Sequence, residues 1–190
     1  MEPKRPAAQP TAVALTIGAA LLRLVPHPPN FAPIGATALF GGARLKGWSA
    51  YLVPLLAMLL TDPILSHMAG YPAYSWGSVV VYSCFLINVF LGRAFLTNTS
   101  SPWRIGTVAI AGSLQFFIIT NFFVWLGASS LYPHTAAGLG ECYIAALPFF
   151  ERTLLADLFY SGVLFTVYAA LTRQANNRAL TTEQSRMRYN

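Results

Sequence analysis

Residues 24–43, with the sequence LVPHPPNFAPIGATALFGGA, interrupt a hydrophobic region near the N-terminus. Proline lacks a backbone N–H donor and biases the preceding residue toward extended conformations, so Pro26, Pro28 and Pro29 predict that a first helix ends near Leu24. The chain then turns back, and Asn30 is expected to cap a second helix that has Pro33 in its first turn. This stretch therefore predicts a helical hairpin with a rigid polar connection.

The composition is that of a membrane protein. Of the 190 residues, 55% are hydrophobic and only 9% are charged, against about 25% charged in soluble domains. The length leaves room for one membrane domain and for no sizeable soluble one. The two cysteines, Cys84 and Cys142, have neither the number nor the spacing of a disulfide framework or a zinc site, and are expected to be separate thiols.

Six apolar segments are expected to be helical, which makes the predicted fold an all-α, polytopic membrane bundle. A helix needs about 20 apolar residues to cross the roughly 30 Å hydrocarbon core. Four segments meet this length, and the first two are shorter. In chain order the segments are Thr11–Val25, Phe31–Ala43, Trp48–Ser66, Trp76–Leu96, Ile105–Gly127 and Thr153–Leu171.

The basic residues predict the orientation of this bundle. Lys and Arg concentrate in short cytoplasmic loops, and ten of the 12 basic residues fall on one side of a six-span arrangement, with Arg23 and Arg152 on the other. Both termini are therefore expected in the cytoplasm. The predicted organisation is a cytoplasmic tail over residues 1–10, a transmembrane domain over 11–172 and a basic cytoplasmic tail over 173–190.

The three histidines fall one in each predicted outer connection. Because neutral imidazole binds transition metals, His27, His67 and His134 are candidate metal ligands. No two of them have the i, i+4 spacing of a ligand pair on one helix. The alternative is that they bond loop backbone, and the sequence leaves the metal unassigned.

Polar residues within the apolar segments are candidate ligand-binding residues. Ionisable groups at membrane depth are costly, which directs attention to Asp62 and Asp157, unless Arg23 or Arg152 neutralises them in a structural ion pair. Ser113, Phe117, Asn121 and Trp125 recur every four residues and share one helical face. The amide of Asn121 either faces a cavity there or bonds a neighbouring helix or a backbone carbonyl.

Small residues spaced by four allow helices to approach closely in a membrane. Such pairs are Ala14 with Gly18 in the first segment and Ala32 with Ala36 in the second. They predict either close packing inside the bundle or docking of another membrane subunit.

Several chemistries lack their motifs. The sequence has no phosphate-binding loop of the Gly-x-x-x-x-Gly-Lys-Ser/Thr type, no His-Glu-x-x-His helix and no nucleophile elbow. We therefore expect neither an enzyme nor a bound cofactor. The net charge of +6 is explained by membrane orientation and contact with anionic lipid rather than by nucleic-acid binding.

The stretches HPPNFAPIGATALFGGA, VPLLAMLLTDPIL, ITNFFVW, LYPHTAAGL and CYIAALPFFERTLLADLFY resemble a bacterial membrane family whose members are labelled transport proteins. The resemblance covers roughly Arg23 to Leu171. That family is in turn distantly similar to the substrate-binding S components of energy-coupling factor importers. Here Asp62 is followed by Pro63 where relatives continue with aliphatic residues.

The resemblance implies a six-helix subunit of a bacterial inner membrane that captures a vitamin-like micronutrient or a metal ion beneath outer loops. It also implies two kinds of partner, a transmembrane coupling subunit and ATPase subunits, with Ala14 and Gly18 at the spacing of the docking motif. The predicted ligand-binding residues are Asn30, Asp62, Asn121, Trp125, Tyr132, His134 and Asp157. The alternative is a structural or scaffold subunit that transports nothing, for which a packed, dry outer half is expected.

Overall fold

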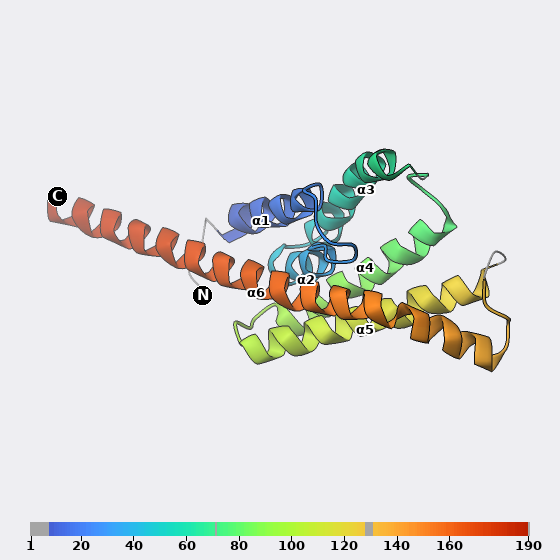
Figure 1. Cartoon of the computed structure of the whole chain (residues 1–190). Helices are drawn as coiled ribbons and strands as arrows, with labels where there is room; N and C mark the ends of the chain where they lie inside the picture. The colour runs from blue at the N-terminus through green and yellow to red at the C-terminus, as the bar shows by residue number, and fades with distance from the viewer. Residues whose placement is uncertain (1–7, 71, 128–130, 190) are drawn as a thin grey trace.

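The computed structural model describes residues 8–70, 72–127 and 131–189. In these ranges the chain forms six α-helices and no strand (Figure 1). The helices are α1 (Ala8–Leu22), α2 (Ile34–Arg44), α3 (Ser49–Ala69), α4 (Trp76–Leu96), α5 (Pro102–Leu126) and α6 (Ala136–Tyr189). The all-α prediction is confirmed, and the first two helices are short, with 15 and 11 residues.

Four of these helices, α3 to α6, are long and apolar enough to cross a membrane. The helix faces that point away from the bundle expose large hydrophobic side chains, such as Leu60 at 72% and Phe90 at 57% of full exposure. A soluble protein rarely exposes so much contiguous apolar surface. The chain is therefore a multi-pass membrane protein whose exposed helical faces contact lipid.

The short helix α2 lies at the centre of the bundle. Every residue from Gly35 to Ala43 is buried, and α2 contacts each of the other five helices. Two glycines allow its backbone to touch that of α4. A Cβ atom on Gly42 would overlap the carbonyl oxygen of Val89, and one on Gly92 would overlap the carbonyl oxygen of Leu39. Small residues thus serve internal packing here, as close helix contacts in membranes require.

Helix α3 continues through two prolines. Pro63 cannot donate a hydrogen bond to the carbonyl of Leu59 four residues earlier. The hydroxyl of Tyr74 donates to that carbonyl instead, over 2.7 Å. The Asp62–Pro63 pair therefore leaves the helix unbroken from Ser49 to Ala69, because a side chain from the following connection satisfies the freed backbone group.

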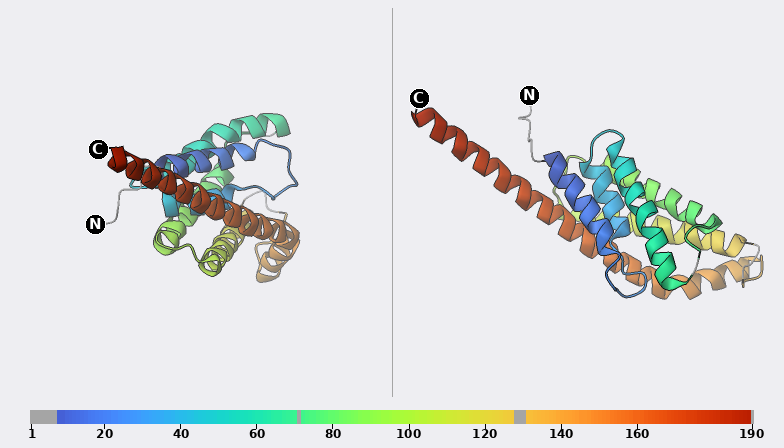
Figure 2. Two further views of the ribbon diagram at one scale, coloured as in Figure 1. Left: turned by 90° about the vertical axis from the view of Figure 1, so that its left-hand side faces the viewer. Right: turned by 90° about the horizontal axis from the view of Figure 1, so that it is seen from above.

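The last helix begins much earlier and ends much later than the predicted segment Thr153–Leu171. Thr135 precedes α6, and its hydroxyl accepts a hydrogen bond from the backbone N–H of Gly138, as in a helix N-cap. The stretch between the predicted segments Ile105–Gly127 and Thr153–Leu171 is therefore helical from Ala136 onward. At its other end α6 extends through 173–189 and projects well past the bundle (Figures 1 and 2).

The two ends of the bundle differ in chemistry. We call the end that carries Arg44, Lys46, Arg93 and Arg104 the basic end. The opposite end is the histidine end, because His27 and His134 lie in its connections and His67 lies in the last turn of α3. At the basic end Arg44 joins three helices. It donates to the carbonyl oxygens of Leu96, the last residue of α4 (2.8 Å), and of Thr99 in the connection that follows (2.6 Å). Its guanidinium lies 4.8 Å from the centre of the Phe165 ring of α6.

Candidate functional site

A pocket of about 300 Å³ lies between α5, α6 and the connection from α1 to α2. Its volume is at the lower end of the range for small-molecule sites. It is nearer the histidine end than the basic end, because α5 contributes residues from its middle and second half. The lining residues are Asn30, Ser113, Phe116, Phe117, Thr120, Asn121, Ala146, Phe149, Phe150 and Thr153.

Asn30 reaches this pocket from a tight turn. The backbone N–H of Phe31 donates to the carbonyl of Pro28 over 3.0 Å, and Asn30 has a positive φ of 62°. Proline followed by a residue in the left-handed region is typical of a type II turn, and asparagine tolerates that conformation. The prediction that Asn30 caps α2 is wrong, because Pro33 occupies the N-cap position and makes no side-chain cap.

The pocket combines aromatic walls with hydrogen-bond acceptors. Thr120 and Thr153 donate their hydroxyl protons to the backbone carbonyls of Phe116 (2.7 Å) and Phe149 (3.0 Å). The Nδ2 group of Asn121 donates to the carbonyl of Phe117 over 2.8 Å. The threonine hydroxyl oxygens and Oδ1 of Asn121 keep lone pairs for a bound molecule. None of the ten residues that line the described pocket is charged.

Asp157 lies next to this pocket and not in its lining. Its side chain is 2% exposed. One carboxylate oxygen accepts the hydroxyl proton of Ser113, a pocket residue, over 2.7 Å, and the other accepts the backbone N–H of Ala36 over 3.1 Å. Asp157 of α6 therefore caps the first turn of α2, where a negative group is favourable. Gly35 makes the approach possible, since a Cβ there would overlap the carboxylate.

Trp125, Tyr132 and His134 lie outside the pocket lining, at or beside the connection between α5 and α6. The indole N–H of Trp125 donates to the carbonyl of Pro133 over 2.8 Å, and its ring centre lies 5.5 Å from that of His134. Gly138 lets the Pro133 carbonyl approach α6 closely. These contacts hold the connection against the ends of both helices.

Asp62 belongs to a separate ion pair. A guanidinium nitrogen of Arg23 lies 2.7 Å from Oδ1 of Asp62, and both side chains are less than one-fifth exposed. Tyr82 of α4 donates its hydroxyl to the other carboxylate oxygen, and Arg23 also donates to Thr61 over 3.1 Å. Asp62 is therefore neutralised in a structural ion pair, and its partner is Arg23 rather than Arg152.

Removing Arg23 should destabilise the contact between α1, α3 and α4. We expect Arg23→Ala to lower the free energy of unfolding by about 1–3 kcal/mol, because Asp62 would remain partly buried without its cation. Thermal unfolding in detergent measures this. The double variant Arg23→Ala with Asp62→Leu should recover part of the loss, and the same loss in the double variant as in the single one would argue against the ion pair.

The histidines are not brought together. In the described ranges no group of three His, Cys, Asp or Glu side chains could hold a metal ion. His27 contacts its own connection, with Nδ1 2.8 Å from the carbonyl oxygen of Val25. His134 contacts the ring of Trp125, whereas His67 lies in the last turn of α3 rather than in a connection.

The four small residues proposed for docking lie in different environments. Ala14 and Gly18 are exposed on one face of α1. Ala32 is half-buried, whereas Ala36 is completely buried inside the bundle. Ala36 therefore offers no surface to another subunit, because α2 is enclosed by the other helices.

Comparison with known proteins gives a family. The model of a family of unknown function (DUF6580) matches residues 4–180. The chain belongs to this family. No curated protein and no solved structure matches the chain. The matched region contains all ten pocket residues, Asp157 and the Arg23–Asp62 pair.

The sequence interpretation missed six of the ten residues that line the pocket. Phe116 and Thr120 precede the identified residues Phe117 and Asn121 by one position on α5, so a wider helical face would have included them. Ala146, Phe149, Phe150 and Thr153 belong to the early turns of α6. The helical spacing of apolar residues over 136–153 could have identified these four residues. The glycines and Pro148 in this segment instead favour a loop.

Proposed function

We propose that this protein is the solute-binding subunit of a membrane transport system, similar in role to an energy-coupling factor S component. The observation that supports this most is the uncharged pocket in which Asn30 and Asn121, which are 91 positions apart in the sequence, share one lining with four phenylalanines. Ligand sites are typically apolar, with a few polar groups that fix orientation.

The lining chemistry suggests the kind of solute. Aromatic side chains favour a flat apolar body, and the acceptor oxygens of Thr120, Asn121 and Thr153 favour N–H or O–H groups on that body. The proposed cargo is a small uncharged or weakly polar organic molecule of vitamin-like size. A free metal ion is disfavoured, since the lining offers no carboxylate, imidazole or thiolate.

The proposal includes an orientation. The basic end faces the cytoplasm and the bundle lies in a bacterial inner membrane. The pocket then opens toward the outer half of the bilayer. The exposed face of α1, which carries Ala14 and Gly18, is then available to a transmembrane coupling subunit that works with ATPase subunits. We propose binding and transport without catalysis.

Filling the pocket should remove the ligand. Ala146 lines the pocket and is 8% exposed. Forcing a larger side chain into such a closely packed position costs about 1–3 kcal/mol of free energy. We expect Ala146→Leu to lower the amount of a co-purified small molecule about 10-fold or more, measured by untargeted mass spectrometry. The matched control is Ala145→Leu, because Ala145 is exposed on the adjacent face of α6.

Asn121→Leu tests the polar part of the pocket. It should weaken binding about 10-fold through loss of one hydrogen bond while the unfolding temperature stays close to that of the unmodified protein. No ligand in the unmodified protein, or equal retention in Ala146→Leu and Ala145→Leu, would favour a scaffold subunit.

A further inference from the structure

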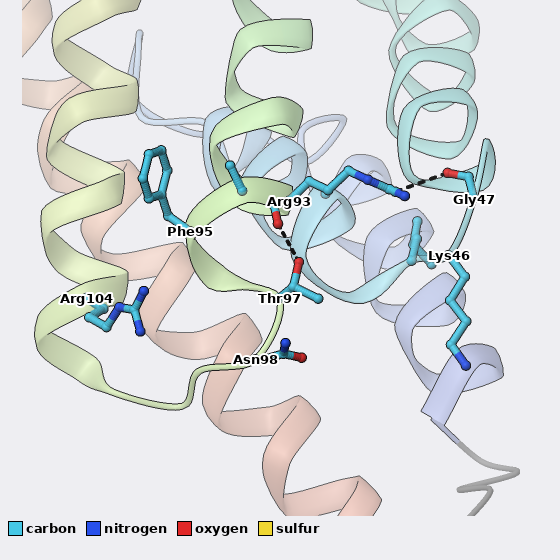
Figure 3. A pocket seen from close by; sticks show the side chains of 10 residues that line it. Lys46, Gly47, Arg93, Phe95, Thr97, Asn98 and Arg104 are labelled. Atoms are coloured by element: carbon cyan, nitrogen blue, oxygen red, sulfur yellow. Dashed lines mark hydrogen bonds between the residues drawn. The ribbon is translucent and has the colours of Figure 1, made fainter. Parts of the chain in front are cut away.

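A second cavity, of about 560 Å³, opens at the basic end between the connection from α2 to α3, the end of α4 and the start of α5. Three cationic residues line it: Lys46, Arg93 and Arg104. Figure 3 shows Arg104 directed toward the connection that carries Thr97 and Asn98, while Arg93 extends to the carbonyl of Gly47. We propose that this cavity binds the phosphate-bearing headgroup of an anionic phospholipid.

The positive charges of this cavity have no counter-charge among the described side chains. In the described part of the chain the single ion pair is that of Arg23 with Asp62, at the other end of the bundle. Asp157 is buried against α2, and Glu141 and Glu151 lie in the early turns of α6. No described carboxylate therefore faces Lys46, Arg93 or Arg104.

The start of α5 adds to the attraction for an anion. The first turn of α5 contains no acidic residue and carries Arg104. A cation near a helix N-terminus is unfavourable by itself, so a bound anion would be favourable to both the helix end and Arg104. Arg44 donates to the backbone carbonyls of the last residue of α4 and of the connection that follows it. The negative end of α4 is thus neutralised, whereas no described side chain caps the positive end of α5, which favours a phosphate group beside it.

The surroundings favour a lipid over a soluble phosphate compound. Trp48 and Trp103 start α3 and α5 at this end and are 81% and 86% exposed. Exposed tryptophans of this kind mark the headgroup level of a membrane. Phe95, which is 50% exposed, forms an apolar wall of the same cavity. A molecule with a phosphate and an acyl chain can contact the cations and this wall together.

The test is native mass spectrometry of the full-length protein in detergent with equal amounts of phosphatidylglycerol and phosphatidylcholine. We expect the protein to retain phosphatidylglycerol preferentially. The double variant Arg93→Gln with Arg104→Gln should lower that affinity about 10-fold or more, since each basic residue near a membrane surface is worth about 1 kcal/mol with anionic lipid. This proposal is independent of the solute pocket.

The matched control is Arg173→Gln with Arg178→Gln, which removes the same charge from the exposed part of α6 and should leave lipid retention unchanged. Arg104→Gln alone is a second test, because its side chain makes no hydrogen bond with any described residue and its loss should leave folding intact. Equal lipid retention by the cavity variants and the unmodified protein would overturn the proposal. So would an equal loss in the control, or displacement of the lipid by millimolar inorganic phosphate.

Discussion

Gly92→Ala should prevent the central helix α2 from packing against α4. A Cβ on Gly92 would overlap the backbone carbonyl of Leu39, which cannot move away without shifting α2 as a whole. Because α2 is buried among the other five helices, this shift would disturb the entire core. We expect a loss of about 3 kcal/mol or more, measured as a lower unfolding temperature and a smaller monodisperse fraction in size-exclusion chromatography.

Two glycines serve as controls for this prediction. Nothing lies within 4 Å of a Cβ built on Gly18 of α1 or on Gly162 of α6. Gly18→Ala and Gly162→Ala should leave stability unchanged or slightly higher, because alanine costs less backbone entropy in a helix. Gly42→Ala should resemble Gly92→Ala, since its Cβ meets the carbonyl of Val89. Similar unfolding temperatures for all four variants would contradict a backbone-to-backbone contact of α2 with α4.

Asp157→Ala should have the second-largest effect. It removes the acceptor for the backbone N–H of Ala36 and the hydroxyl of Ser113, both in the buried core. A lost cap and an unsatisfied buried donor together predict a decrease of about 2–4 kcal/mol in the free energy of unfolding. Asp157→Asn keeps one oxygen acceptor and should lose less than half as much.

A double-mutant cycle checks whether Asp157 acts through α2. Gly35→Ala alone should be destabilising, because its Cβ would overlap the Asp157 carboxylate. In the Asp157→Ala background that space is free, so the same Gly35→Ala change should cost much less. Additive losses, measured by thermal unfolding, would show that the two residues are not in contact.

The sequence was most informative about the helices that face lipid. The segment predicted at Trp76–Leu96 coincides with α4, and that predicted at Trp48–Ser66 lies within three residues of the ends of α3. A lipid-facing helix must be apolar over its whole length, so a local count of residues locates it. Only the middle of α6 was predicted, at Thr153–Leu171, because Pro148 and the polar residues after Leu171 interrupt the apolar pattern although the backbone stays helical.

The candidate site was only partly predictable for a related reason. The spacing of Ser113, Phe117 and Asn121 identified one wall of the pocket, since residues four apart share a helical face. Asn30 joins that wall only because a tight turn carries it toward α5. Asp62 has the same polar character as the pocket residues in sequence, but its position beside Arg23 makes it part of an ion pair.

The amino-acid sequence by itself determined that this protein is an all-helical membrane bundle with two short first helices. Hydrophobicity and proline chemistry act over a few neighbouring residues, and so both are visible in a linear pattern. The tertiary structure alone decided that α2 is the buried centre and that Asp157 caps it from 121 positions away. A hydrogen bond between distant segments depends on how all the helices pack, and no local pattern records that arrangement.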